Sequence, residues 1–277
     1  MITKDTQLCM SLAGRPGNFG TIFQNYLYGK LNLNFLYKAF TTSNLEDAVK
    51  GIRALAIRGC AISMPFKEAC IPMLDGLDHS AATIESVNTI VNTDGVLKGY
   101  NTDYIAIEQL LLQNNIDKKV RFALRGNGGM AKAVMAALYN NGYKNGVVIV
   151  RREEVGQEIQ KKYGFNYQLN DVVEADLLIN ATPIGMQGGV EASELSFTTD
   201  SVTKATYVFD GVALPSITPL IAKAQALGKE TILGSDVAVI QSLEQFVLYT
   251  GVRPEISLIK EAQRYTQEML AMLDQTK

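Results

Sequence analysis

One stretch of sequence decides the fold: Val120-Arg121-Phe122-Ala123-Leu124-Arg125-Gly126-Asn127-Gly128-Gly129-Met130-Ala131. Its apolar start predicts a strand, its glycines predict a tight turn, and the apolar residues that follow predict a helix. This is the order of a dinucleotide-binding fold, in which Gly126 permits the turn, Gly128 lets the backbone approach a pyrophosphate, and Ala131 packs helix on strand. The helix start also offers free N–H groups. Such a turn can instead serve packing alone, so the surrounding sequence has to decide.

The second strand of this unit, predicted over 146–150, ends in Arg151 and Arg152. An acidic residue at this point would accept the ribose 2′-hydroxyl of NAD, whereas guanidinium groups favour a 2′-phosphate. The arginines therefore predict NADP as the cofactor. The alternative is that both arginines are solvated and neutralised by Glu153 and Glu154.

Two later strands, predicted over 175–180 and 207–210, run into loops that contain Thr182-Pro183 and Gly211. Because the carboxyl ends of parallel strands meet at one edge of a sheet, these loops are expected to line a nicotinamide site.

Strands also alternate with helices over the first hundred residues, which indicates an α/β sheet with crossovers. Asp94-Gly95 lies between two further apolar runs and predicts a hairpin. The sequence therefore predicts a two-domain α/β protein: an N-terminal domain of residues 1–103, completed by C-terminal helices over 237–277, and a Rossmann-type domain of residues 104–236.

Composition excludes several classes of protein. The 277 residues carry a formal net charge of -2, which gives no electrostatic basis for binding nucleic acid. No apolar run approaches the roughly 20 residues of a spanning helix, and no leader peptide is recognisable. Three cysteines without a CxxC pair and a single histidine, His79, predict neither a disulfide framework nor a metal site. A small-molecule ligand and a cytoplasmic location are expected.

A lysine and a carboxylate in the N-terminal half suggest proton chemistry. Lys67 comes just after a predicted strand, and Asp103 comes just after the hairpin. Brought together, they would form a proton-transfer pair for interconverting an alcohol and a ketone. Spacing alone leaves open that Lys67 is a surface lysine and Asp103 an unrelated turn residue.

The order of these motifs resembles that of the shikimate dehydrogenase family, NADP-dependent enzymes of aromatic amino acid biosynthesis that reduce 3-dehydroshikimate to shikimate. The family's Asn-Val-Thr-x-Pro-x-Lys element corresponds to residues 61–67, Ala-Val-Asn-Thr to 86–89, and Gly-x-Asn-Thr-Asp to 99–103. The resemblance implies that the active site is the cleft between the domains. It also implies that Lys67 and Asp103 are the catalytic pair and that Asn88 is a substrate ligand.

The nucleotide-binding half of the chain is similar to the family as well. Gly-Ala-Gly-Gly-x-Ala corresponds to residues 126–131, and the Asn-Arg-Thr clamp for the 2′-phosphate corresponds to Arg151-Arg152-Glu153, with glutamate replacing threonine. Gln241 falls where the family binds substrate hydroxyls. The cofactor-binding residues implied are Gly126, Asn127, Gly128, Gly129, Met130, Ala131, Arg151, Arg152, Thr182 and Gly211.

The departures from the family concern the substrate. The Ser-x-Ser pair that grips the substrate carboxylate is absent, and only Thr21 supplies a comparable hydroxyl. Ala61 and Ser63 replace the asparagine and threonine of the lysine element, and Ala213 replaces a tyrosine. Each lost contact costs about 1 kcal/mol. The substrate ligands implied are Thr21, Ser63, Asn88 and Gln241.

Three functional hypotheses follow. The first is a shikimate dehydrogenase-like paralogue, a monomer or homodimer, with reduced activity on shikimate. The second keeps the hydride chemistry and changes the substrate to quinate or another hydroxylated ring acid. The third is a non-catalytic NADP-binding sensor or partner module, against which the presence of both Lys67 and Asp103 argues.

Overall fold

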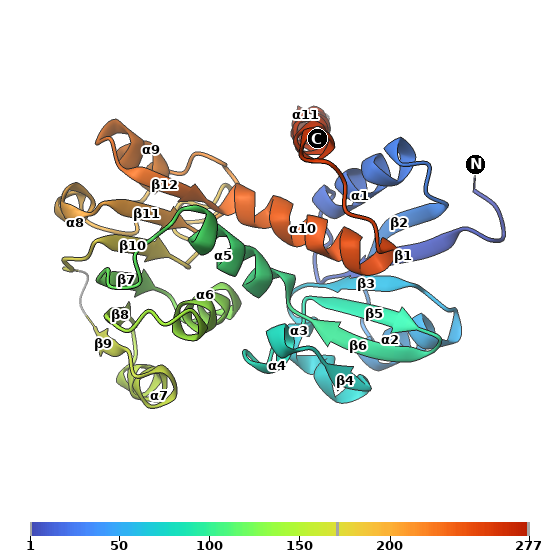
Figure 1. The fold of residues 1–277 in the computed structure, drawn as a ribbon, viewed down its shortest axis with the longest axis horizontal. Coiled ribbons are helices and arrows are strands. Elements are labelled where there is room, and N and C mark those ends of the chain that lie inside the picture. Colours follow the sequence, from blue (N-terminus) through green and yellow to red (C-terminus); the bar gives the residue numbers. More distant parts are fainter. Residues whose placement is uncertain (1, 170–171, 276–277) are drawn as a thin grey trace. The chain divides into compact units, whose positions relative to one another are not determined.

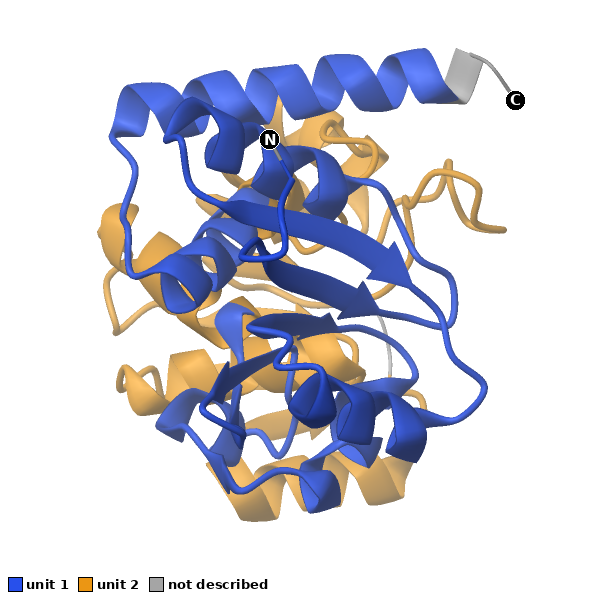
Figure 2. Cartoon of the chain, turned by 90° about the vertical axis from the view of Figure 1, so that its right-hand side faces the viewer, with its two compact units in different colours: residues 1–102, 239–277 blue, residues 103–238 orange. Residues whose placement is uncertain are grey.

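The computed structural model describes residues 2–169 and 172–275, which form two units (Figure 2). Unit 1 consists of the chain up to Thr102 together with the part from Val239 onwards, and unit 2 consists of Asp103–Ala238. Each unit is built around one six-stranded sheet. The predicted two-domain α/β architecture with a Rossmann-type domain is confirmed.

The sheet of unit 1 is mixed, with the strand order β2-β1-β3-β5-β6-β4 (Figure 1). β1, β2 and β3 are parallel, whereas β5 is antiparallel to both β3 and β6. Asp94 and Gly95 both have positive φ, of 52° and 88°, as the tight turn between β5 and β6 requires. The strands are β1 (Gln7–Leu12), β2 (Phe35–Phe40), β3 (Gly59–Ile62), β4 (Gly76–Leu77), β5 (Thr89–Thr93) and β6 (Val96–Tyr100).

Polar side chains cap the starts of helices α2 and α4 in unit 1. Asn44 accepts from the backbone N–H of Asp47, and Asp78 accepts from the backbone N–H of Ser80. The long C-terminal helix α11 packs on α1, where the rings of Tyr26 and Tyr265 stack 4.4 Å apart. The helical elements are α1 (Phe19–Lys30), α2 (Leu45–Ala54), α3 (Phe66–Ala69), η1 (Ile71–Met73), α4 (His79–Ala82), α10 (Gly234–Thr250) and α11 (Ile256–Gln275).

Unit 2 has a fully parallel sheet with the strand order β12-β11-β10-β7-β8-β9. Numbered within the unit, this is the Rossmann order, and the direction of winding reverses between β7 and β10. Ligands of such sheets bind at the carboxyl ends of the strands beside this reversal. The strands are β7 (Phe122–Arg125), β8 (Gly146–Ile149), β9 (Asn166–Gln168), β10 (Leu177–Asn180), β11 (Tyr207–Asp210) and β12 (Glu230–Leu233).

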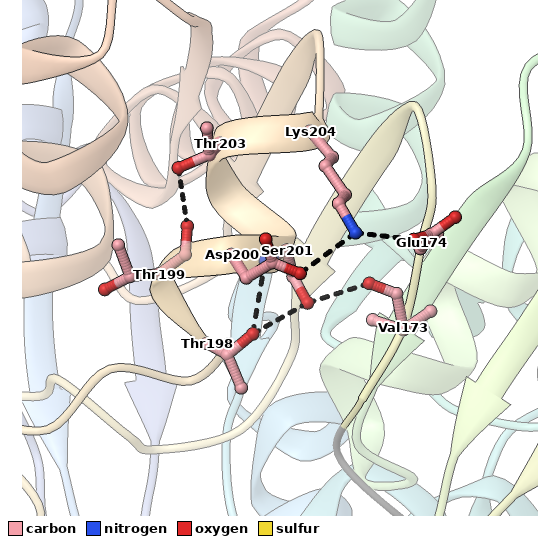
Figure 3. Close-up of polar contacts among 8 residues, drawn as sticks. All are labelled: Val173, Glu174, Thr198, Thr199, Asp200, Ser201, Thr203 and Lys204. Carbon is pink, nitrogen blue, oxygen red and sulfur yellow. Dashed lines mark hydrogen bonds and ion pairs between the residues drawn. The ribbon is translucent and has the colours of Figure 1, made fainter.

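Helix α5 precedes β7, and helices α6, α7, α8 and α9 lie between the strands of this sheet. The short helix α8 shows how such a helix is fixed (Figure 3). Thr198 caps it by accepting from the backbone N–H of Ser201, whose hydroxyl donates to the carbonyl of Val173 at 2.8 Å. Lys204 pairs with Glu174 at 2.5 Å, which ties α8 to the segment before β10. The helices are α5 (Thr102–Gln113), α6 (Gly129–Asn140), α7 (Glu153–Tyr163), α8 (Thr199–Lys204) and α9 (Pro219–Ala226).

Across the two described ranges, we find no helix that combines the length and the apolar character needed to cross a membrane.

Close packing of a ring on a glycine holds α10 against the sheet of unit 1. A Cβ on Gly59 would lie 2.2 Å from Tyr249 ring atoms, and Tyr249 is 1% exposed. We therefore expect Gly59→Ala to lower the free energy of unfolding by about 1–3 kcal/mol, as overpacking does. Denaturant titration measures this change.

The control is Gly51→Ala in α2, where a Cβ meets no described atom within 4 Å. It should raise the free energy of unfolding by about 0.5–1 kcal/mol. Equal effects of the two substitutions would contradict the packing argument.

Candidate active site

Several of the predicted site residues of unit 1 lie at one edge of its sheet. Ser63 directly follows β3, Asn88 directly precedes β5, and Thr102 comes two residues after β6. Since β5 is antiparallel to β3 and β6, these positions meet at the same edge. The Asn88 carbonyl accepts from the Ile62 N–H at 2.7 Å, and the Asn88 N–H donates to the Tyr100 carbonyl at 3.0 Å.

The side-chain oxygen of Asn88 is the centre of a buried hydrogen-bond network. Asn88 Oδ1 accepts from the Thr102 backbone N–H at 2.8 Å, from the Thr102 hydroxyl at 3.1 Å and from the Thr89 hydroxyl at 2.8 Å. A backbone N–H can only donate, so the orientation of the amide is fixed by its chemistry. Asn88 is 3% exposed, and its Nδ2 has no hydrogen-bond partner among the described residues. A buried donor without a partner is costly unless a ligand supplies the acceptor.

Helix α10 contributes amides to the same network. Gln241 Oε1 lies 3.5 Å from the Thr102 hydroxyl, and Gln241 Nε2 donates to the Ser242 hydroxyl at 2.7 Å. Gln245 Nε2 lies 3.1 Å from the Thr89 hydroxyl and 3.3 Å from the Asn88 carbonyl. The structure therefore places Asn88 and Gln241 in one network, in which the Thr102 hydroxyl lies between them. Gln245 is a further member that contacts Thr89 and the Asn88 carbonyl.

Lys67 and Asp103 belong to different units. Lys67 lies in the short helix α3, which begins directly after Pro65, and its carbonyl accepts from the Val87 N–H at 2.8 Å. This bond fixes α3 to the residue that precedes Asn88. Lys67 is half-buried. Asp103 opens unit 2 directly after Thr102, the residue that Asn88 Oδ1 holds.

Thr21 and Ser63 differ in their surroundings. Thr21 lies in the first turn of α1, and its hydroxyl is buried without a hydrogen-bond partner among the described residues. Ser63 is exposed, and its backbone carbonyl accepts from the N–H of Phe66 at the start of α3. Of the two hydroxyl groups, only that of Thr21 is buried, so its lack of a hydrogen bond is costly unless a ligand forms one.

The glycines of the turn after β7 are present for different reasons. Gly126 has φ of 125°, and a Cβ there would lie 2.7 Å from the Ala181 carbonyl oxygen, so the chain itself requires glycine. Gly128 has an ordinary φ of -80°, and a Cβ on Gly128 or Gly129 would meet no described atom within 4 Å. Backbone strain and packing therefore do not explain these two glycines. The lack of a side chain on both residues leaves open space at the N-terminus of α6.

The loops after β10 and β11 close around this turn. A Cβ on Gly126 would lie 3.3 Å from Thr182 Cγ2, and a Cβ on Gly211 would lie 3.1 Å from Met130 Cγ. Four of the predicted cofactor residues thus meet at the carboxyl ends of β7, β10 and β11. At the end of β8, Arg151 and Arg152 are exposed, and neither makes an ion pair with another residue in the described ranges.

A buried carboxylate connects the two loops. Asp210 is 0% exposed and accepts from the Asn180 amide at 2.9 Å, the Val212 N–H at 3.0 Å and the Thr218 hydroxyl at 2.6 Å. Asn180 Oδ1 in turn accepts from the Thr182 hydroxyl at 2.6 Å. Burial raises the pKa of Asp210, and the three hydrogen bonds oppose this rise.

Metal and thiol chemistry have little basis in the structure. In the part of the chain that the structure describes, no group of three or more His, Cys, Asp or Glu side chains is arranged to hold a metal ion. His79 is exposed. Cys9, Cys60 and Cys70 are buried, and burial raises the pKa of Cys9 and of Cys70 to about 12. Such thiols are poor nucleophiles.

Comparison with known proteins identifies the family of this chain. Residues 20–90 match the family model described as the shikimate dehydrogenase substrate binding domain. A shikimate dehydrogenase-like protein of Haemophilus influenzae is 53% identical over 96% of this chain and 99% of its own length. The chain belongs to the shikimate dehydrogenase family. The resemblance read from its motifs is therefore confirmed.

Solved structures of the family contain both ligand types. Shikimate 5-dehydrogenase of Thermus thermophilus, in complex with NADP(H) and shikimate, is 27% identical with a TM-score of 0.83, covering 94% of this chain and all of that one. Quinate dehydrogenase of Corynebacterium glutamicum, in complex with NAD, is 25% identical with a TM-score of 0.82, covering 93% and 98%. The first of these relatives therefore binds NADP(H) and shikimate, and the second binds NAD.

Sequence reasoning missed the buried residues that support the site. Thr102 was visible in the Asn101-Thr102-Asp103 element, but its contact with Asn88 depends on how the strands pair. Gln245 follows Gln241 by one helical turn, a spacing that places both on one face of α10. The sequence analysis includes Asp210 only as the last residue of a predicted strand. A carboxylate at the end of an apolar strand is itself a signal, because a buried carboxylate needs hydrogen-bond donors around it.

The raised pKa of Asp210 predicts a pH dependence. As the pH rises above the unfolded-state pKa of about 3.9, the unfolded chain loses the Asp210 proton before the folded chain does. The stabilisation associated with the protonated folded form therefore declines until the pH has passed the raised folded-state pKa. Relative to Asp210→Asn, the wild-type protein should lose stability over this window, as measured by urea unfolding at a series of pH values. A constant difference between the two proteins across the series would refute this cause.

Proposed function

We propose that this chain is an NADP-dependent oxidoreductase that interconverts a ring hydroxyl and a ketone on a shikimate-type acid. The observation that carries the proposal is the buried, unpartnered Nδ2 of Asn88. It is a fixed donor at the sheet edge where the family resemblance implies a substrate ligand. Unit 1 would be the substrate-binding and catalytic domain, and unit 2 the NADP-binding domain.

The cofactor residues present fit a dinucleotide phosphate. The space over Gly128 and Gly129 at the start of α6 accommodates a pyrophosphate, which the N–H groups and dipole of a helix N-terminus stabilise. Arg151 and Arg152 are exposed beside the end of β8, where a ribose 2′-phosphate needs cationic donors. Arg152 also directly precedes α7 as its N-cap. When bound, NADP supplies or accepts the hydride.

The chain's own residues manage the proton and the position of the substrate. In the direction of oxidation, Lys67 would take the hydroxyl proton, with Asp103 as its partner. Asn88 Nδ2 would donate to a substrate oxygen, and Thr21, Ser63 and Gln241 would contact the other ring substituents. The protein contributes orientation and proton management, while the redox chemistry belongs to the cofactor.

Shikimate and quinate remain distinct substrate candidates. Because the serine pair is replaced by Thr21 alone and Ala61 lacks a polar side chain, we propose reduced activity on shikimate. Quinate or another hydroxylated ring acid is the second candidate, supported by the similarity to a quinate dehydrogenase. A pure NADP-binding module is disfavoured, since it would have no use for Lys67 and Asp103. We place the reaction in the cytoplasm, where the three free thiols would stay reduced.

The experiment that tests the proposal is the initial rate of NADP reduction with shikimate and with quinate. The wild-type protein should show saturable rates with at least one substrate, higher with NADP than with NAD. Lys67→Ala should lower kcat by about 10²–10⁴-fold, the usual contribution of a general acid–base group, while the Kd for NADP stays unchanged.

The matched control is Lys50→Ala, which removes an exposed lysine paired only with Glu46. Its rates should equal those of the wild type. Wild-type turnover in Lys67→Ala would refute the assignment of this lysine.

A further inference from the structure

Gln24 in α1 is a buried amide that the proposed function does not use. It is 0% exposed, and its Nε2 donates to the backbone carbonyl of Ser242 in α10 at 2.8 Å. A carbonyl can only accept, so this bond fixes which end of the amide is the oxygen. Gln24 Oε1 is then a buried acceptor without a partner among the described residues. A buried acceptor without a partner is costly unless a group from outside the chain donates to it.

Gln24 is connected to the Asn88 network of unit 1 through hydrogen bonds of helix α10. Its partner Ser242 also accepts from Gln241, which lies beside Thr102 in the Asn88 network. Gln24 also follows Thr21 by three residues, a spacing that places both side chains on one face of α1. Thr21 is the residue that, by the family resemblance, supplies a hydroxyl in place of the serine pair that grips the substrate carboxylate, and among the described residues this hydroxyl also has no partner.

The chemistry of these atoms differs from that of a carboxylate clamp. A carboxylate offers only acceptors, so it gains nothing from an amide oxygen that is also only an acceptor. A hydroxyl on the same carbon can donate to that oxygen while the carboxylate accepts from Thr21. The neighbouring residue Asn25 shows the contrast, because both ends of its amide are bonded inside the protein, to Thr21 and Tyr37.

We propose that Gln24 is a specificity-determining residue that accepts a hydrogen bond from a hydroxyl beside the substrate's carboxylate. The preferred substrates are then ring acids with a hydroxyl on the carboxylate-bearing carbon, that is, ring α-hydroxy acids such as quinate. This inference rests on the proposed function, since it takes the substrate to be a ring acid held through Thr21. Shikimate has a double bond at that carbon and lacks this hydroxyl, so it leaves Gln24 Oε1 unpaired.

The test is calorimetric binding of quinate and of 1-deoxyquinate, which lacks only that hydroxyl, to the full chain with NADP present. The wild-type protein should bind quinate about tenfold more tightly, the change in Kd that one ordinary hydrogen bond contributes. Gln24→Met keeps the length of the side chain and removes the acceptor. Gln24→Met should raise the Kd of quinate about tenfold and leave the Kd of 1-deoxyquinate unchanged. The ratio of the two Kd values should therefore approach one.

Two controls separate specificity from stability. Thr21→Val should raise the Kd of quinate and the Kd of 1-deoxyquinate by the same factor. Asn25→Ala should lower the melting temperature and keep the wild-type ratio of the two Kd values. Equal affinities in the wild type, a ratio that survives Gln24→Met, or no binding of either ligand would each overturn the proposal. If Gln24→Met does not fold, the deciding measurement is the ratio of the Kd values of quinate and 1-deoxyquinate in the wild-type protein. The expected ratio without any NADP reduction would contradict the proposed function and leave the role of Gln24 intact.

Discussion

The three hydrogen bonds that converge on Asn88 Oδ1 are the constraint on which the substrate side of this protein depends. They join the start of β5 to the residue that follows the hairpin, and they use every donor that Thr102 has. Because Oδ1 is fully occupied, Nδ2 is left as a fixed donor in a buried position. A group oriented in this way loses no freedom when a ligand binds, which is the advantage of a preorganised site.

Unit 2 uses a comparable device at the carboxyl edge of its own sheet. Asp210 accepts three hydrogen bonds and so connects the ends of β10 and β11 with the cap of α9, which Thr218 provides. In both units a buried acceptor organises the loops, and the groups available to ligands lie around it. Gly128 and Gly129, in the turn after β7, leave open space where we propose that the cofactor binds. The sheets supply rigidity, and these acceptors determine where the polar groups lie.

Local features could be predicted from the sequence because neighbouring residues determine them. The glycine turn at Gly126, the Asp94-Gly95 hairpin and the Asn44 cap all depend on residues within a few positions of one another. The Asn88 network could not be predicted in this way, since its bonds join residues 14 and 139 positions apart. The motif resemblance identified Asn88 and Gln241 but not Thr102, Gln245 or Gln24, whose roles depend on which end of each buried amide is already bonded.

The most direct test of the central claim is the steady-state kinetics of Asn88→Asp with NADP and the better of the two ring acids. Aspartate keeps an oxygen for the three internal donors and replaces the Nδ2 donor by a second acceptor, so the network remains while the ligand contact is inverted. The account predicts a folded protein with an unchanged Kd for NADP and a kcat/KM lowered by about tenfold or more. A folded variant with the kcat/KM of the wild type would contradict the account.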